Sequence, residues 1–252
     1  MTGYLLINKS AFAKASADRP ENITSFQCVN HIKKIIRQAT KEKIKIGHAG
    51  TLDPFATGLL IICVGRQATK KISNFLNLDK TYLVKAKLGE LTDTLDKTGA
   101  IVEEEKEQTS PAISKNALEG AIRALGAEYV QTPPIYSALK HEGQPLYKLA
   151  REKSVDQSKL EEIIKSKSRV VKLYKVELLE YEPPFFTFIA HVSKGTYIRS
   201  LANDIAKLAG SCATTYELER TKIGDFSVKD AVSLDKIKTI EDIKKYLLNF
   251  VE

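Results

Sequence analysis

The residues best suited to chemistry lie in one glycine-rich segment, 47–58. Its sequence is Gly-His-Ala-Gly-Thr-Leu-Asp-Pro-Phe-Ala-Thr-Gly, and the apolar run 59–65 follows at once. Glycine permits backbone angles and close approaches that a side chain would forbid, and Pro54 biases Asp53 away from the helical region. The sequence therefore predicts one carboxylate in a loop that is held by a buried strand, and catalytic groups concentrate on such loops.

Local chemistry leaves the role of this carboxylate open. The alternative for Asp53 is an Asx-type turn, in which the side chain only bonds its own backbone, and Asp-Pro is a common turn pair. A single histidine beside glycine, such as His48, is usually an ordinary loop residue. His31, His141 and His191 share no ligand spacing with one another or with the cysteines. The sequence therefore disfavours metal catalysis, and we expect no metal site.

Composition narrows the class of protein. The chain has 252 residues, of which 43% are hydrophobic and 28% charged, as in soluble globular proteins. Its net charge is +8, and residues 1–50 carry nine Lys and Arg against three Asp and Glu, mostly within 31–45. A basic surface favours a polyanion through release of counterions, although lysine-rich helix faces are often only solvated. The charge by itself favours nucleic acid as the partner.

Targeting signals and cysteines indicate the compartment. The apolar runs are shorter than a membrane span, and the N-terminus has neither a basic leader nor a cleavage site. Cys28, Cys63 and Cys212 are odd in number, widely spaced and form no C-x-x-C pair. We therefore expect reduced thiols, no zinc, no membrane association and a cytoplasmic location.

Hydrophobic periodicity predicts the elements that position these residues. Strands are expected over 4–8, 59–65, 80–88, 170–181 and 185–192. Helices are expected from Thr24 or Ser25 through Ile36, over 114–125 and 195–208, and near 240–250. Strands and short helices without regular alternation predict an α+β fold with a mixed or mostly antiparallel central sheet, flanked by helices.

Several motifs resemble those of one enzyme family. Segment 47–58 resembles the G-H-x-G-x-L-D-P-x-A-x-G-x-L motif of the TruB class of tRNA pseudouridine synthases. Four further segments resemble motifs of this class, in its order, and the resemblance extends from residue 4 to about 232. These segments are Asp79-Lys80-Thr81-Tyr82, Ile135 through Arg151, Lys194-Gly195-Thr196-Tyr197-Ile198-Arg199 and Leu218-Glu219-Arg220-Thr221.

The resemblance implies a reaction and its catalytic residues. The reaction is isomerisation of uridine to pseudouridine at position 55, in the T loop of tRNA, without a cofactor: the C1′–N1 bond breaks and the base rejoins through C5. Asp53 is the implied catalytic carboxylate, by covalent attack or by assisting loss of the C2′ proton, and both routes stay open. Arg199 is the implied cation that keeps Asp53 ionised in a closed site. A cation in the first turn of a helix gains nothing from the helix dipole, which itself favours an anionic partner for Arg199.

The same resemblance implies the contacts to RNA. The target uridine must be flipped out of its loop, and Tyr82 is expected to stack on it and handle the C5 proton. Tyr197 and Leu218 would form apolar walls, and His48 would fill the gap left by the base. The alternative is that Tyr82 only packs, half-buried, on its strand and that Leu218 is an ordinary core residue. Phosphate contacts are expected from Lys140, Lys148, Arg151 and Arg220. For Lys140, Lys148 and Arg151 a solvated helix face is the alternative.

Two departures from the family pattern affect the expected organisation. A single catalytic domain is expected over 1–252, with a cleft across its sheet and an RNA-gripping insertion near 133–153. The family usually begins with a strand followed by K-P-x-G-x-T-S. Residues 10–19 separate Lys9 from 20–25, which resemble the rest of that motif, and we expect this insertion to loop out. The chain ends after the helix near 240–250, so no separate C-terminal RNA-binding domain is expected.

The T arm of tRNA is therefore the expected partner. No protein partner is implied, and the size and charge are compatible with a monomer. Two alternatives are the same chemistry on another RNA, and an RNA-binding or tRNA-folding protein whose catalysis is secondary or lost. Every motif residue needed for catalysis is present, which argues against the second.

Overall fold

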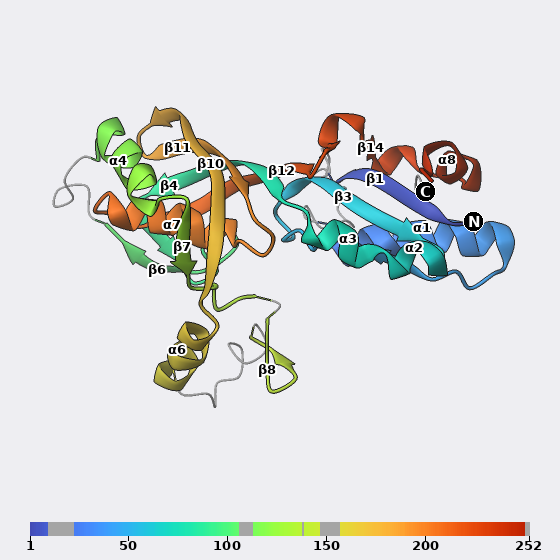
Figure 1. Cartoon of the computed structure of the whole chain (residues 1–252), viewed down its shortest axis with the longest axis horizontal. Helices are drawn as coiled ribbons and strands as arrows, with labels where there is room; N and C mark the ends of the chain where they lie inside the picture. Colours follow the sequence, from blue (N-terminus) through green and yellow to red (C-terminus); the bar gives the residue numbers. More distant parts are fainter. Residues whose placement is uncertain (10–22, 106–112, 138, 147–156, 250–252) are drawn as a thin grey trace. The chain divides into compact units, whose positions relative to one another are not determined.

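The computed structural model describes residues 1–9, 23–105, 113–137, 139–146 and 157–249 (Figure 1). The chain divides into unit 1, Met1–Tyr82 with Leu218–Glu252, and unit 2, Leu83–Glu217. The strands β4 (Lys80–Leu88) and β12 (Ala213–Ile223) carry residues of both units.

Unit 1 contains a mixed sheet built on β1 (Gly3–Lys9) and β3 (Thr57–Val64). These strands pair antiparallel from Gly3 opposite Val64 to Lys9 opposite Gly58. The remaining strands of this part of the sheet are β2 (Ile46–His48), antiparallel to β3; β12, parallel to β3; β13 (Phe226–Ser227), antiparallel to β12; and β14 (Val232–Ser233), parallel to β1. The register places Lys9 where the glycine-rich segment enters β3.

The core of unit 1 forms around β3. Apart from Thr57, every residue of β3 is buried, as its continuous apolar run predicts. Ile61 packs in a cluster with Leu6 of β1 and Phe75. The rings of Tyr4 and Phe226 lie 5.3 and 5.6 Å from that of Phe75, in tilted and edge-on arrangements. This core also contains Ala49, so it fixes one end of the glycine-rich segment.

The main helix of unit 1 is α1 (Ser25–Thr40), whose apolar face packs inward. Thr24 is its N-cap: its hydroxyl accepts from the Gln27 N–H, and the Gln27 side chain accepts from the Thr24 N–H. This capping box confirms the predicted start of the helix. The other helical segments of unit 1 are α2 (Arg66–Lys70), α3 (Ile72–Asn77), η1 (Val228–Asp230), η2 (Leu234–Lys236) and α8 (Ile240–Tyr246).

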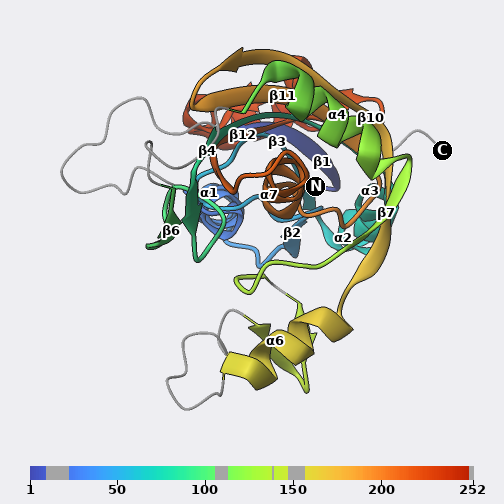
Figure 2. The same cartoon turned by 90° about the vertical axis from the view of Figure 1, so that its left-hand side faces the viewer.

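Unit 2 combines an antiparallel sheet with two long helices. β10 (Arg169–Glu182) pairs antiparallel with β11 (Phe185–Val192) and with β7 (Glu128–Gln131). The helices α4 (Lys115–Leu125) and α7 (Ile198–Leu208) contact each other, and α4 also contacts β10 (Figure 2). The smaller elements are the hairpins β5 (Glu90–Thr92) with β6 (Ile101–Glu104) and β8 (Lys140–His141) with β9 (Gln144–Pro145), and the helix α6 (Gln157–Ser166).

The architecture confirms the predicted α+β class with a mixed, largely antiparallel sheet. α7 begins at Ile198 rather than 195, since Gly195 has φ +79° and lies in a turn. α8 ends at Tyr246, earlier than expected. The insertion 10–19 lies outside the described residues, and the single domain and absent C-terminal domain stay predictions.

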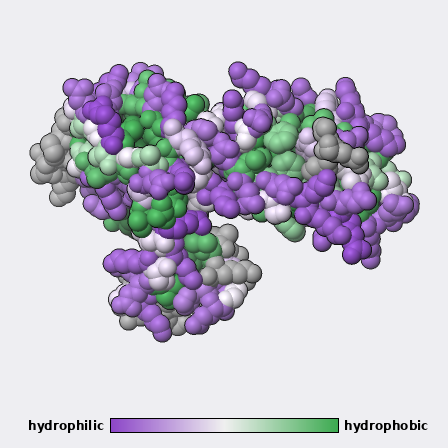
Figure 3. Space-filling view, in the orientation of Figure 1, coloured by the Kyte–Doolittle hydropathy of each residue, from purple (hydrophilic) through white to green (hydrophobic). Residues whose placement is uncertain are grey.

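The surface agrees with the composition. Hydrophilic residues cover most of the face seen in Figure 3, and hydrophobic residues form smaller groups between them. No helix among the described residues is both long and apolar enough to cross a membrane. Cys28, Cys63 and Cys212 are free and buried.

Candidate functional site

The Asp53 loop, residues 49–56 between β2 and β3, is held by three polar side chains from three elements of unit 1. These are Lys9 at the end of β1, Ser25 at the start of α1 and Arg220 on β12. Asp53 is half-buried, and its carbonyl accepts from the N–H of Ala56 at 3.1 Å, which closes a tight turn. The turn confirms the geometry expected from Asp-Pro.

Of these three side chains, Lys9 makes the most hydrogen bonds to the loop. Its ammonium donates to the carbonyls of Asp53 at 3.2 Å, of Pro54 at 2.9 Å and of Ala56, and the residue is only 1% exposed. Burial lowers the pKa of Lys9 to about 8, so the group still carries its proton at neutral pH. An ammonium has three donors, and three carbonyls of the loop receive them. Lys9 therefore fixes the backbone at the carboxylate-bearing residue and directly after it.

Ser25 and Arg220 hold the rest of the loop. The Ser25 hydroxyl accepts from the Leu52 N–H at 2.9 Å and donates to the Leu52 carbonyl at 3.2 Å. The Arg220 guanidinium, 2% exposed, donates to the carbonyls of Leu59 at 2.8 Å and Gly50 at 3.0 Å. Burial and these contacts favour support of the loop as the role of Arg220 over the predicted contact with RNA.

Gly58 explains why the motif needs glycine where β3 begins. It has φ +98°, and an added Cβ would lie 2.4 Å from the Arg220 carbonyl oxygen. Real Cβ atoms do not approach backbone this closely, and side chains avoid that φ. Gly58 therefore permits the parallel pairing of β3 with β12 that brings the Arg220 side chain beneath the loop.

His48, Tyr82 and Leu218, the predicted substrate contacts in unit 1, lie on three strands. His48 ends β2, and desolvation, helped by Arg220, lowers its pKa, so its imidazole is neutral at neutral pH. Its buried Nδ1 has no hydrogen-bond partner among the described residues. Tyr82 lies half-buried on β4, and Leu218, 6% exposed, lies on β12. Their contacts with substrate stay predictions.

Replacing Lys9 by methionine tests how the loop is held. The variant keeps the apolar stem but leaves buried carbonyls without donors, so we expect the free energy of unfolding to fall by about 3 kcal/mol. We also expect kcat to fall about 10- to 100-fold, because small displacements of a catalytic group are costly. Urea unfolding and turnover measured on folded protein check both values.

Lys80 provides the matched control, because its buried ammonium likewise donates to three carbonyls, those of Phe75, Leu76 and Leu78. We expect Lys80→Met to lower the free energy of unfolding by a similar amount and to lower kcat less than Lys9→Met does. A Lys9→Met variant that loses stability but keeps the parent kcat would show that Lys9 acts only on stability.

In unit 2, Arg199 forms a buried ion pair that the sequence analysis missed. Its guanidinium lies 3.4 Å from Asp96 Oδ2, and it donates to the carbonyls of Thr94 and Tyr136, the latter at 3.0 Å. Arg199 and Asp96 are 4% and 5% exposed. Asp96 is held in turn by the N–H of Thr98 at 2.9 Å and by the Thr98 hydroxyl. The anion that these contacts place beside Arg199 is thus Asp96, and the predicted pairing of Arg199 with Asp53 stays a prediction.

Gln131 fixes the backbone that precedes Arg199. Its side-chain oxygen accepts from the Tyr197 N–H at 2.7 Å, and its amide donates to the Tyr197 carbonyl at 3.0 Å and to the Tyr129 hydroxyl. Gln131 is 1% exposed. Tyr197, at the N-cap of α7, also stacks its ring against the Arg169 guanidinium, 5.3 Å away. Gln131 therefore fixes Tyr197, the N-cap of α7, two residues before Arg199.

The predicted RNA contacts of the insertion are only partly placed. Lys140 lies on β8, while Lys148 and Arg151 lie outside the described residues. Among the described residues, Leu146 packs with Leu160 and Ile164 of α6 in a small separate core. The contacts of Lys140, Lys148 and Arg151 with RNA stay predictions. Within the described part of the chain, no three His, Cys, Asp or Glu side chains are grouped to hold a metal.

Comparisons with known proteins agree on one family. The profile of the "TruB family pseudouridylate synthase (N terminal domain)" matches residues 33–198. The tRNA pseudouridine synthase B of Clostridium tetani is 40% identical over 230 residues, covering 91% of this chain and 73% of that relative. The protein of the same name from Desulfotalea psychrophila is 37% identical over 248 residues, covering 91% of this chain and 94% of its own.

Solved structures support the fold. A chain of a "Cbf5-Nop10-Gar1 Complex" superimposes with a TM-score of 0.63 at 24% identity, over 93% of this chain and 53% of its own. A chain of an "H/ACA RNP bound to a substrate RNA containing 2'-deoxyuridine" gives a TM-score of 0.61 at 22% identity, over 93% and 52%. The chain thus spans about half the length of these two, and at this identity they show the fold alone.

Proposed function

Because the chain belongs to the TruB family of pseudouridylate synthases, we propose that it isomerises uridine to pseudouridine in the T loop of tRNA. One observation carries the proposal: a relative named tRNA pseudouridine synthase B is 40% identical, with 91% of this chain covered. The structure supports it, because the loop of the Asp53 carboxylate is held from three sides by Lys9, Ser25 and Arg220. A loop with a firmly held backbone suits a reaction that depends on one positioned carboxylate.

In the proposed reaction, Asp53 acts on a flipped uridine, by covalent attack or by assisting loss of the C2′ proton. The C1′–N1 bond breaks, the uracil turns, and a C1′–C5 bond forms; the C5 hydrogen leaves as a proton, and N1 ends protonated. Tyr82 stacks on the base. His48, held neutral because its pKa is lowered, occupies the gap in the RNA without the cost of burying a charge.

Release of tritium from a tRNA transcript labelled at uridine C5 tests this function directly. Formation of the C1′–C5 bond expels the C5 hydrogen to solvent, so we expect stoichiometric release and a pseudouridine at the T-loop target. A transcript with cytidine at that position is the control and should release none by this route. Release of tritium from a ribosomal RNA fragment but not from tRNA would identify ribosomal RNA, and not tRNA, as the substrate. Tight binding of tRNA without release would favour a binding or folding role.

A further inference from the structure

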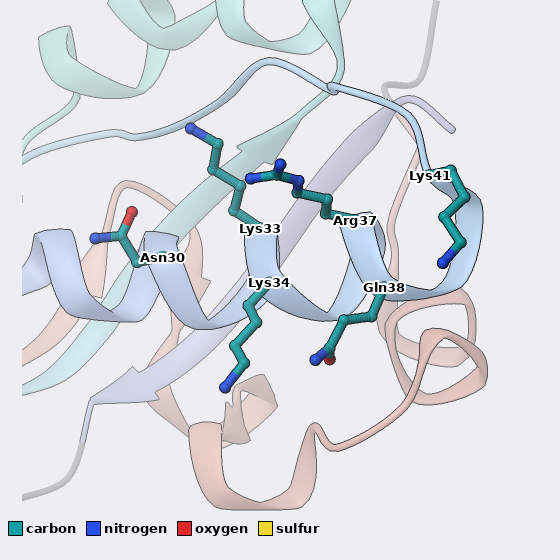
Figure 4. A pocket seen from close by; sticks show the side chains of 6 residues that line it. All are labelled: Asn30, Lys33, Lys34, Arg37, Gln38 and Lys41. Atoms are coloured by element: carbon teal, nitrogen blue, oxygen red, sulfur yellow. The ribbon is translucent and has the colours of Figure 1, made fainter.

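The outward face of α1 carries cations in two rows. Lys33 and Arg37 point to one side of the helix, and Lys34 and Gln38 point to the other (Figure 4). With Asn30 and Lys41 these residues line one open hollow on unit 1. We call Lys33, Lys34, Arg37 and Lys41 the α1 cationic face.

These charges are not neutralised within the part of the chain that the structure describes. Helix α1 contains no Asp or Glu, and none of the four cations forms an ion pair with a described carboxylate. Arg37 also lies four residues from both Lys33 and Lys41, a spacing at which like charges repel. The helix dipole favours cations in the last turn, which accounts in part for Arg37 and Lys41 but not for Lys33 and Lys34 in the middle of the helix.

The cationic surface continues beyond the helix. A second hollow shares Lys33 and Arg37 with the first and extends to Lys43 and Lys45, directly before β2; its lining contains four cations and one carboxylate, that of Glu42. β2 ends at His48, so this surface leads along the chain toward the candidate site. The other end of α1 is tied to the Asp53 loop through Ser25 and Leu52. The α1 cationic face is therefore rigidly connected to the loop within one unit.

A polyanion fits this surface better than a lipid does. The apolar side of α1, which includes Cys28, Ile32 and Ile36, is buried in unit 1 and cannot insert into a membrane. The exposed side chains that line the hollow are amides and cations, which suit phosphate oxygens. Lysines and arginines on one helix face are the electrostatic footprint of a nucleic-acid backbone.

We propose that the α1 cationic face binds phosphates of the substrate RNA at nucleotides away from the target uridine. At 1.5 Å per residue, Lys33 to Lys41 lie ~12–24 Å along the helix from Ser25, where the Asp53 loop is attached. The face therefore adds affinity without touching the reacting base. The inference rests on the proposed function, since it takes the substrate to be RNA.

The test compares two variants with equal loss of charge. In the first, the four residues of the face become glutamine, a good helix former that preserves α1. In the second, four exposed lysines elsewhere in unit 1 become glutamine: Lys229, Lys236, Lys238 and Lys245. Binding of full-length tRNA is measured at several salt concentrations, kcat is measured at saturating tRNA, and thermal unfolding checks the fold.

We expect the first variant to bind tRNA at least about 10-fold more weakly near 0.1 M salt. The slope of its binding constant against salt concentration, both as logarithms, should fall by about three, because about three fewer counterions are released. Its kcat at saturation should be unchanged, and the second variant should bind nearly as the parent does. Equal weakening in both variants, or none in either, would overturn the inference, as would a loss of kcat at saturation. Weaker binding of poly-glutamate but not of tRNA would assign the face to an acidic protein instead. Failure of the parent to release tritium would reject the proposed function separately.

Discussion

The Asp53→Asn variant is expected to lose pseudouridine formation, with tritium release reduced by about 10⁴-fold or more. Asparagine has nearly the shape of aspartate but no ionised oxygen, so it can neither attack the sugar nor take a proton from C2′. The loss is expected on either route. The measurement is the initial rate of tritium release at saturating tRNA, with protein made in a host that lacks its own enzyme.

The variant should remain folded and should still bind tRNA. The contacts that anchor the turn to Lys9 and Ala56 use the Asp53 carbonyl, which the substitution keeps. Asp225→Asn is the matched control: it makes the same chemical change at an exposed residue of unit 1 and should retain the parent rate. An Asp53→Asn protein that turns over at a tenth of the parent rate or faster would show that this carboxylate is not the catalytic one.

The sequence predicted the elements around Asp53 because their signals are local. A continuous apolar run predicts β3, alternation predicts β4, and a capping residue at Thr24 or Ser25 predicts the start of α1. The glycine pattern with Asp-Pro likewise predicts a tight loop entering a buried strand. Each of these signals lies within about ten residues, where periodicity and turn chemistry act.

The groups that hold the site were not predicted, because their partners are far away in the sequence. Lys9 contacts carbonyls 44 to 47 residues later, and Gln131 contacts Tyr197 across 66 residues. A lysine at the end of a strand ordinarily reaches solvent, yet Lys9 is buried. Only the register of β1 with β3 shows that Lys9 faces the loop. For Arg199 the helix-dipole argument predicted an anion, but nothing local singled out Asp96.

Asp96→Asn is expected to have the second largest effect, acting through Arg199. Removal of one partner of a buried ion pair weakens the stabilisation of the other charge, and such changes typically cost 3–5 kcal/mol. Asparagine retains an oxygen that accepts from Thr98, and Arg199 still donates to the carbonyls of Thr94 and Tyr136. We therefore expect the free energy of unfolding to fall by about 3 kcal/mol. Urea unfolding measures this value.

Activity should fall as well, because Arg199 is the cation that the family resemblance assigns to the catalytic carboxylate. We expect kcat to fall about 100-fold with little change in the affinity for tRNA, since a guanidinium released from Asp96 is no longer oriented. Asp93→Asn is the control: Asp93 lies in the same turn, where its carboxylate accepts from the N–H of Ala100 at 2.9 Å. This variant should keep most of the parent kcat.

A double-mutant cycle with Arg199→Lys separates orientation from simple loss of stability. Lysine keeps the charge but lacks the planar fork that reaches Asp96 and the two carbonyls at once. If Asp96 acts by orienting the guanidinium, Arg199→Lys alone lowers kcat, and adding Asp96→Asn lowers it little further. Additive losses of kcat would show that the two residues act independently, and Asp96 would then be only a structural residue of the β5–β6 hairpin.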